Sequence, residues 1–98
     1  MLADMATDLA MCEAWLWHVA RLVDGGAEDF GVEASMLKMR ASDLAMSIAT
    51  DAVQLHGGYG YCQDYRVERL MRDAKITQIW EGTNQIHRQF IGRSFIER

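Results

Sequence analysis

Residues 79–86 read Ile79-Trp80-Glu81-Gly82-Thr83-Asn84-Gln85-Ile86 and place one carboxylate between a tryptophan and a glycine. Gly82 lets the backbone turn, and Thr83 can cap a helix that follows. A carboxylate beside Trp80 in an apolar pocket would have its charged form desolvated, which raises its pKa toward the range of a general base. The same residues also fit a plain connection between two helices with a solvated Glu81, so the octet alone leaves both interpretations open.

Two long helices are predicted upstream of this stretch, because apolar residues recur there in steps of three and four. One apolar stripe runs from Leu2 to Val23 and stops at Gly25-Gly26, since glycine readily takes the left-handed position after a helix. Two apolar stripes run side by side between Met36 and Leu55, which indicates a helix buried on more than one side. Gly57-Gly58 is expected to end this second helix.

Two shorter helices are predicted in the rest of the chain. Asp64 can cap a third helix that runs to about Ile76, and residues 77–82 then form a non-helical crossing. The last helix is expected to follow Thr83. The sequence therefore predicts an all-α chain, an up-down four-helix bundle with short connections.

Composition narrows the classes of function. The chain has 98 residues, enough for one small domain, and its formal net charge of −4 offers no general attraction to nucleic acid or to an anionic membrane. No segment is long and apolar enough to span a bilayer, and no signal peptide is recognisable at the N-terminus. Cys12 and Cys62 are expected to be free thiols. The three histidines show no zinc-ligand spacing, so no metal site is predicted.

Two further motifs precede the octet, and their order and spacing are informative. They are Gln54-Leu55-His56-Gly57-Gly58-Tyr59-Gly60-Tyr61 and Arg72-Asp73-Ala74-Lys75-Ile76. Together with residues 79–86 they resemble the C-terminal helical domain of the FAD-dependent acyl-CoA dehydrogenases. The resemblance covers essentially the whole chain and is most specific from about residue 51 to residue 93. One departure is Arg66, which stands where many members of the family carry a proline.

The resemblance implies a role for Glu81 as the catalytic base. In the family, this residue removes a proton from the carbon next to the thioester carbonyl of an acyl-CoA, while a hydride leaves the next carbon for the flavin. The backbone N–H of the same glutamate and a flavin hydroxyl stabilise the developing enolate oxygen. Trp80, Glu81 and Gly82 match positions that line the substrate pocket, although Trp80 also fits an ordinary core position.

The resemblance also implies contacts to FAD. Gln54 and Gly58 match positions that meet the adenine-nucleotide half of an FAD bound by a neighbouring subunit. Thr83 and Gln85 match positions near the FAD pyrophosphate, and a helix N-terminus suits an anion on physical grounds alone. A simpler interpretation remains for Gly58 as a helix stop and for Thr83 as a helix cap.

Residues 1–98 would then be a C-terminal helical-bundle domain that lacks the family's N-terminal and middle domains, inactive and without FAD in isolation. The resemblance implies a homo-oligomeric parent enzyme, a tetramer, that acts on acyl-CoA in fatty acid β-oxidation. Its electrons would pass to an electron-transferring flavoprotein, in the bacterial cytoplasm or the mitochondrial matrix. Two alternatives stay open: an acyl-CoA oxidase-like flavoenzyme and a non-catalytic helical assembly domain.

Overall fold

The computed structural model describes residues 1–97. Its elements are four α-helices and one short 3-10 helix: α1 (Leu2–Asp24), α2 (Gly31–His56), η1 (Gly57–Tyr61), α3 (Val67–Thr77) and α4 (Asn84–Ile96). No strand occurs in residues 1–97. The prediction of an all-α chain with four helices is confirmed.

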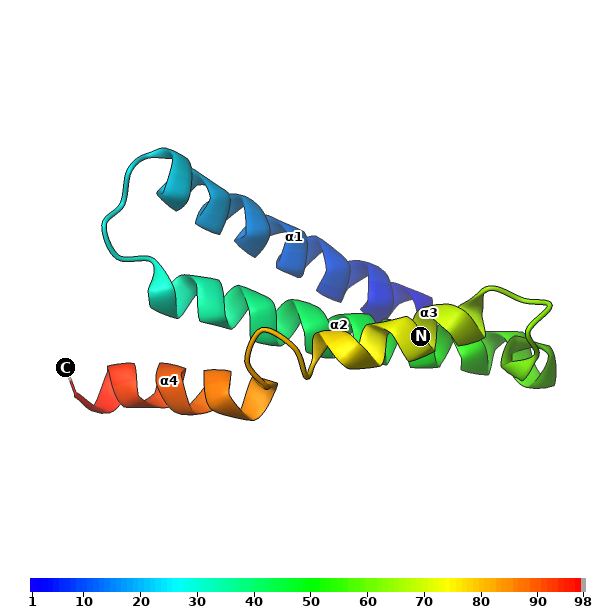
Figure 1. Ribbon diagram of the computed structural model, residues 1–98. Helices are drawn as coiled ribbons and strands as arrows, with labels where there is room; N and C mark the ends of the chain where they lie inside the picture. Colours follow the sequence, from blue (N-terminus) through cyan, green and yellow to red (C-terminus); the bar gives the residue numbers. More distant parts are fainter. Residues whose placement is uncertain (98) are drawn as a thin grey trace.

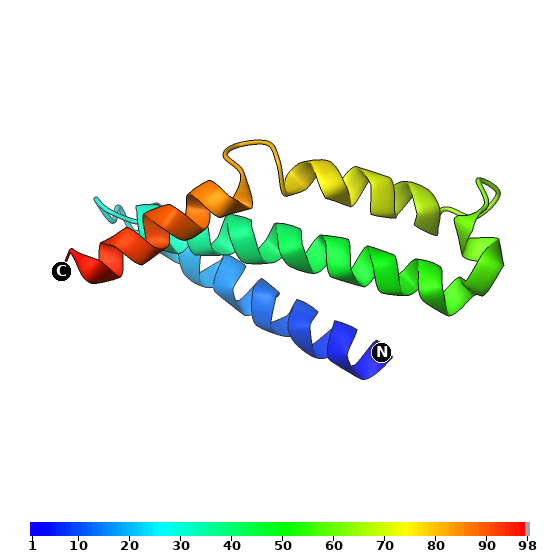
Figure 2. The same cartoon turned by 90° about the horizontal axis from the view of Figure 1, so that it is seen from below.

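Helix α2 is the central element, because α1, α3, α4 and η1 all pack against it (Figure 1). Helices α3 and α4 follow one another along α2 and run in the same direction, opposite to that of α2 (Figures 1 and 2). Within residues 1–97, α1 packs on neither α3 nor α4, and α3 and α4 do not pack on each other. The arrangement is therefore more open than four mutually antiparallel helices, because the connection between α3 and α4 does not reverse the chain.

Few side chains are buried inside this arrangement. Val19 and Ala74 are the buried apolar residues among those described. Large apolar side chains remain exposed on every helix, for example Leu2, Leu55 and Ile96. Extensive exposed apolar surface is typical of a face that packs against another protein surface. The helices of this chain thus have little core of their own, so polar contacts between them carry more weight than usual.

The glycine stops are confirmed. Gly26 follows α1 with a φ of 78°, and Gly57 follows α2 with a φ of 66°, both in the left-handed region. The pairing of α1 with α2 is supported by a hydrogen bond from the Trp15 Nε1–H to the Glu33 carbonyl oxygen at 3.2 Å.

The predicted start of the third helix is wrong. Helix α3 begins at Val67 after Arg66, and Asp64 makes no capping bond. Asp64 instead lies in a turn in which the Tyr65 N–H donates to the Cys62 carbonyl at 3.1 Å, because the chain must first reverse from η1 onto α2. Arg66 has a φ of −64°, which is the value that a proline ring imposes. The backbone at this position therefore has the geometry that the family's proline would give it.

The charged residues of α3 form pairs one helical turn apart. Arg69 pairs with Asp73 at 3.6 Å, and Arg72 pairs with Glu68 at 2.8 Å. A hydrogen bond from Arg72, together with its charge, lowers the pKa of Glu68. In these ion pairs Arg69, Arg72 and Asp73 are exposed, whereas the Glu68 side chain keeps 13% of its surface. None of the described helices is long and apolar enough to cross a membrane.

Candidate active site

The connection between α3 and α4, residues 78–83, carries Glu81 in an unusual backbone conformation. Glu81 has a φ of 56°, and it is the one non-glycine residue with a positive φ among residues 1–97. Gly82 follows with a φ of 83°. A left-handed conformation costs a non-glycine residue roughly 1–2 kcal/mol, and it persists where neighbouring contacts hold it. Such a residue is a candidate for a functional position.

Hydrogen bonds fix this turn from both sides. The His87 ring donates from Nε2 to the Glu81 carbonyl oxygen at 2.9 Å, and Lys38 Nζ donates to the Gly82 carbonyl oxygen at 2.8 Å. The Asn84 N–H closes the turn by donating to the Gln78 carbonyl at 3.1 Å. Thr83 Oγ1 accepts from the Ile86 N–H at 3.3 Å, so the predicted cap of the last helix is confirmed.

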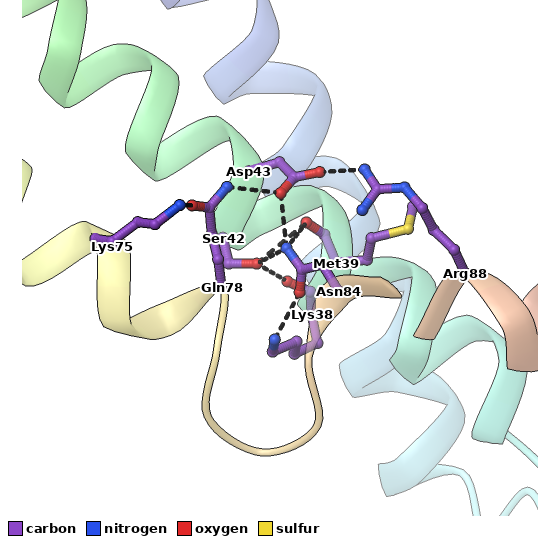
Figure 3. A network of polar contacts seen from close by, with 8 residues as sticks. All are labelled: Lys38, Met39, Ser42, Asp43, Lys75, Gln78, Asn84 and Arg88. Carbon is purple, nitrogen blue, oxygen red and sulfur yellow. Dashed lines mark hydrogen bonds and ion pairs between the residues drawn. The ribbon is translucent and has the colours of Figure 1, made fainter. Parts of the chain in front are cut away.

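Asn84 joins the turn to α2 (Figure 3). Its side chain is 2% exposed. The amide nitrogen donates to Ser42 Oγ at 2.8 Å and to Asp43 Oδ1 at 2.7 Å, and the Met39 carbonyl lies at 3.3 Å. The amide oxygen accepts from Lys38 Nζ at 2.6 Å. Every polar atom of the Asn84 side chain is therefore paired, as buried polar groups require.

Asp43 is the second centre of the same network. It accepts from Gln78 Nε2 at 2.9 Å and forms an ion pair with Arg88, in addition to its bond from Asn84. Partial burial alone would raise the pKa of Asp43. The hydrogen bonds from Arg88, Gln78 and Asn84, with the positive charge of Arg88, outweigh that effect and hold the pKa below its ordinary value of 3.8. Asp43 thus links α2 to both ends of the turn and to α4.

The Glu81 carboxylate and the Trp80 indole are both exposed, and Trp80 keeps 56% of its surface. The apolar surroundings expected for Glu81 are therefore not supplied by residues 1–97. No hydrogen bond within the described residues involves the N–H groups of Glu81, Gly82 or Thr83. Within residues 1–97, the turn therefore carries both backbone N–H groups without a hydrogen-bond partner and an exposed carboxylate.

The predicted FAD-contact residues fall into two groups. Thr83 and Gln85 lie beside Glu81 at the start of α4, whereas Gln54 and Gly58 lie at the far end of α2 and in η1. Eleven residues separate Asp43 from Gln54 along α2, about 16 Å at the rise of an α-helix. This chain therefore does not bring the two groups together.

The glycines of η1 differ in their surroundings. No other atom lies within 4 Å of the position that a Cβ would take on Gly58, so its backbone is open to a ligand. At Gly60 a Cβ would lie 2.6 Å from the Val53 carbonyl oxygen and 2.8 Å from His56 Cβ. Gly60 is therefore needed for the packing of η1 on α2, while Gly58 is free for another role.

A cavity of about 780 Å³ lies elsewhere, between α1 and α2. Its lining includes Cys12, Trp15, Met36 and Arg40, and Glu81 does not contribute to it.

Cys12 and Cys62 are free thiols, as predicted. No group of three or more His, Cys, Asp or Glu side chains within residues 1–97 could hold a metal ion.

Sequence reasoning missed the residues that hold the turn. No local pattern in the sequence indicates that Lys38 or His87 donates to the turn at Glu81. The one available signal was Asp43, a charge that interrupts the apolar stripes of the second helix and so calls for a polar partner. Its partners lie 35 to 45 residues away in the sequence, where no local pattern reveals them.

Comparison with known proteins identifies the family. The family profile described as "Acyl-CoA dehydrogenase, C-terminal domain" matches residues 1–96. The chain belongs to the acyl-CoA dehydrogenase family. Among its relatives is an acyl-CoA dehydrogenase of Bacillus subtilis, 54% identical over 92 residues, which are 94% of this chain and 24% of the relative. The resemblance predicted from the three motifs is thus confirmed.

Solved structures agree with this assignment. Butyryl-CoA dehydrogenase from Megasphaera elsdenii matches with a TM-score of 0.92 and 43% identity, over 97% of this chain and 24% of its own. A chain in a structure described as the electron transferring flavoprotein of Acidaminococcus fermentans matches with a TM-score of 0.94 and 48% identity, over 100% of this chain and 26% of its own. The present chain spans about a quarter of the length of the relatives it matches.

Proposed function

We propose that residues 1–98 are the C-terminal helical domain of a flavoenzyme that α,β-dehydrogenates acyl-CoA thioesters, with Glu81 as the base. The observation that carries the proposal is the turn at Glu81. Its left-handed backbone is held by donors from two helices, while its carboxylate and its N–H have no hydrogen-bond partner within residues 1–97. Family membership supplies the class of substrate, since relatives are named as dehydrogenases of acyl-CoA and butyryl-CoA.

The chemistry assigned to Glu81 has two parts. The carboxylate takes a proton from the carbon next to the thioester carbonyl, which leaves an enolate-like charge on the carbonyl oxygen. The N–H of Glu81 itself donates to that oxygen and stabilises the charge, as in an oxyanion hole. Trp80 and Gly82 flank the carboxylate and would line the acyl group. FAD, when bound, accepts the hydride that leaves the neighbouring carbon.

The residues assigned to FAD suit one edge of the cofactor. Gly58 has open space above its α-carbon, and Gln54 and Gln85 are exposed. Thr83 stands at the N-terminus of α4, where unpaired N–H groups favour an anion such as a pyrophosphate. The separation of the two groups along α2 is compatible with Gln54 and Gly58 serving an FAD held by a neighbouring subunit.

The surroundings of the domain are also part of the proposal. Exposed apolar side chains on all four helices fit burial against the two other domains of the family and against further subunits of a homo-oligomer. An electron-transferring flavoprotein is the proposed electron acceptor, in line with the structure from Acidaminococcus fermentans. The proposed location is the bacterial cytoplasm or the mitochondrial matrix.

The test uses the complete flavoprotein that contains this chain, mixed with acyl-CoA in the absence of air. The proposal predicts that the flavin absorbance bleaches, and that Glu81→Gln slows bleaching about 10²–10⁴-fold while flavin content and acyl-CoA binding survive. Glu81→Asp should keep part of the activity, because a displacement on the order of 1 Å can cost about 10²-fold.

Two outcomes would favour the alternatives. If the reduced flavin reoxidises rapidly in air, the protein is an acyl-CoA oxidase. If no acyl-CoA reduces the flavin, or if the complete protein binds no flavin, the domain serves assembly and the proposed function is wrong.

A further inference from the structure

The peptide carbonyls of Glu81 and Gly82 each accept a hydrogen bond from a side chain that lies outside the turn. The Glu81 carbonyl oxygen accepts from His87 Nε2 of α4 at 2.9 Å, and the Gly82 carbonyl oxygen accepts from Lys38 Nζ of α2 at 2.8 Å. We call this pair of donors, His87 and Lys38, the carbonyl clamp. It acts on the backbone of the proposed base, and neither donor touches the Glu81 carboxylate.

The geometry determines the protonated nitrogen of His87. A carbonyl oxygen only accepts, so Nε2 must carry a hydrogen. In the neutral ring Nδ1 is then an acceptor, and Ser35 Oγ lies 3.1 Å from it, positioned to donate. Ser35 is 9% exposed and belongs to α2, the same helix as Lys38. Ser35 therefore sets the orientation of the ring that holds the Glu81 carbonyl.

The clamp also fills the inner side of the turn. A Cβ on Gly82 would lie 3.1 Å from His87 Nε2, so a side chain there would press against the ring, and the φ of 83° also favours glycine. Lys38 donates in addition to Asn84 Oδ1 at 2.6 Å, which fixes its ammonium group against a buried amide. Both donors are thus held in place by contacts of their own.

We propose that His87 and Lys38 are positioning residues for the Glu81 base. Left to itself, a non-glycine residue disfavours the left-handed conformation by roughly tenfold or more. The clamp holds Glu81 in that conformation by binding the carbonyl oxygens of Glu81 and Gly82, and no other group within residues 1–97 binds the Glu81 N–H. In this arrangement the Glu81 carboxylate acts on the α-carbon of the substrate, and the Glu81 N–H donates to the oxygen of the adjacent thioester carbonyl. This inference rests on the proposed function of Glu81.

The experiment compares paired variants of the complete flavoprotein. His87→Leu removes the donor, and His87→Gln retains an N–H of similar reach. Lys38→Met and Lys38→Arg form the same pair at the other donor. We expect His87→Leu and Lys38→Met to slow flavin reduction by roughly 10–100-fold at saturating acyl-CoA, with unchanged flavin content and acyl-CoA affinity. The donor-retaining variants should recover most of the rate, and His18→Leu, on exposed α1, should match the wild type.

A double variant that combines His87→Leu with Glu81→Gln shows whether His87 acts by positioning Glu81 or by supporting the fold in general. If His87 acts through Glu81, His87→Leu should cost little more once the base is gone, because effects within one unit are not additive. A full additional loss in the double variant would overturn the proposal. A wild-type rate in both His87→Leu and Lys38→Met would also overturn the proposal. The same holds if these variants fail to fold and the donor-retaining variants fail to fold as well.

A structural readout is independent of activity. Crystal structures of the wild type and of His87→Leu should differ in φ at Glu81, positive in the first and relaxed in the second. An unchanged positive φ in His87→Leu and Lys38→Met would overturn the clamp even if Glu81→Gln is slow. A wild-type rate in Glu81→Gln would instead overturn the proposed function.

Discussion

Replacement of Asn84 by alanine tests whether the polar network, rather than apolar packing, holds the Glu81 turn on α2. The change removes a side chain that is 2% exposed and that makes strong bonds to Lys38, Ser42 and Asp43. Bonds that involve charged partners are worth about 1.5–3 kcal/mol and neutral ones about 0.5–1.5 kcal/mol. Lys38 and Asp43 keep other partners, so we expect a net loss of about 2–4 kcal/mol.

That loss should be conspicuous in thermal unfolding of the 98-residue chain. For a chain of this size, 1 kcal/mol shifts Tm by about 4–8 °C, so a loss of about 2–4 kcal/mol in Asn84→Ala should lower Tm by roughly 8–32 °C. The matched control is Gln85→Ala, one residue along the same helix, because the Gln85 side chain is exposed and makes no hydrogen bond within residues 1–97. It should stay within about 0.5 kcal/mol of the wild type. Circular dichroism at one fixed protein concentration gives both values. Equal melting of Asn84→Ala and Gln85→Ala would refute the reasoning.

Three further predictions concern pH, packing and association. Because the pKa of Asp43 is lowered in the folded chain, the stability that its ionised form contributes is complete above the pKa of the unfolded chain, near pH 4. This contribution is lost as the pH falls through the pKa of the folded chain. Urea titrations at a series of pH values should show this loss, and Asp43→Asn should make the stability depend less on pH. Gly60→Ala should destabilise the chain by about 1–3 kcal/mol through overpacking against Val53 and His56, whereas Gly58→Ala, in open space, should melt like the wild type. The isolated chain should self-associate through its exposed apolar faces, and a monomer in sedimentation at high micromolar concentration would contradict this. It should also carry no flavin as purified, and a stoichiometric flavin spectrum would contradict that expectation.

The helices could be predicted because their determinants are local. The apolar stripe from Leu2 to Val23 and the stops at Gly26 and Gly57 act within a few residues, and Thr83 caps the helix directly after it. The start of α3 could not be placed in this way. Asp64 is a good capping residue, but the reversal from η1 onto α2 uses residues 62–66 as a turn.

The sequence pointed to Glu81 as a candidate base, a role that stays a prediction, whereas the side chains that hold its turn could not be predicted. Glu81 was a candidate because a carboxylate desolvated beside Trp80 would suit a general base, and three motifs in register indicated the family. Lys38 contacts Gly82 across 44 residues, and Asn84 contacts Ser42 across 42 residues. Contacts of this kind depend on how the connection at residues 78–83 sets α4 beside α2, and this geometry is decided by tertiary packing.

The most direct test of Glu81 as the base is hydrogen exchange at the α-carbon of acyl-CoA. The complete flavoprotein is incubated with acyl-CoA in heavy water, and mass spectrometry follows the deuterium that enters the α-position. This reaction requires proton removal by the base and return of a deuteron, independently of the electron acceptor. The account predicts ready exchange with the wild type and exchange about 10²–10⁴-fold slower with Glu81→Gln. Exchange at the wild-type rate in Glu81→Gln would show that another residue removes the proton.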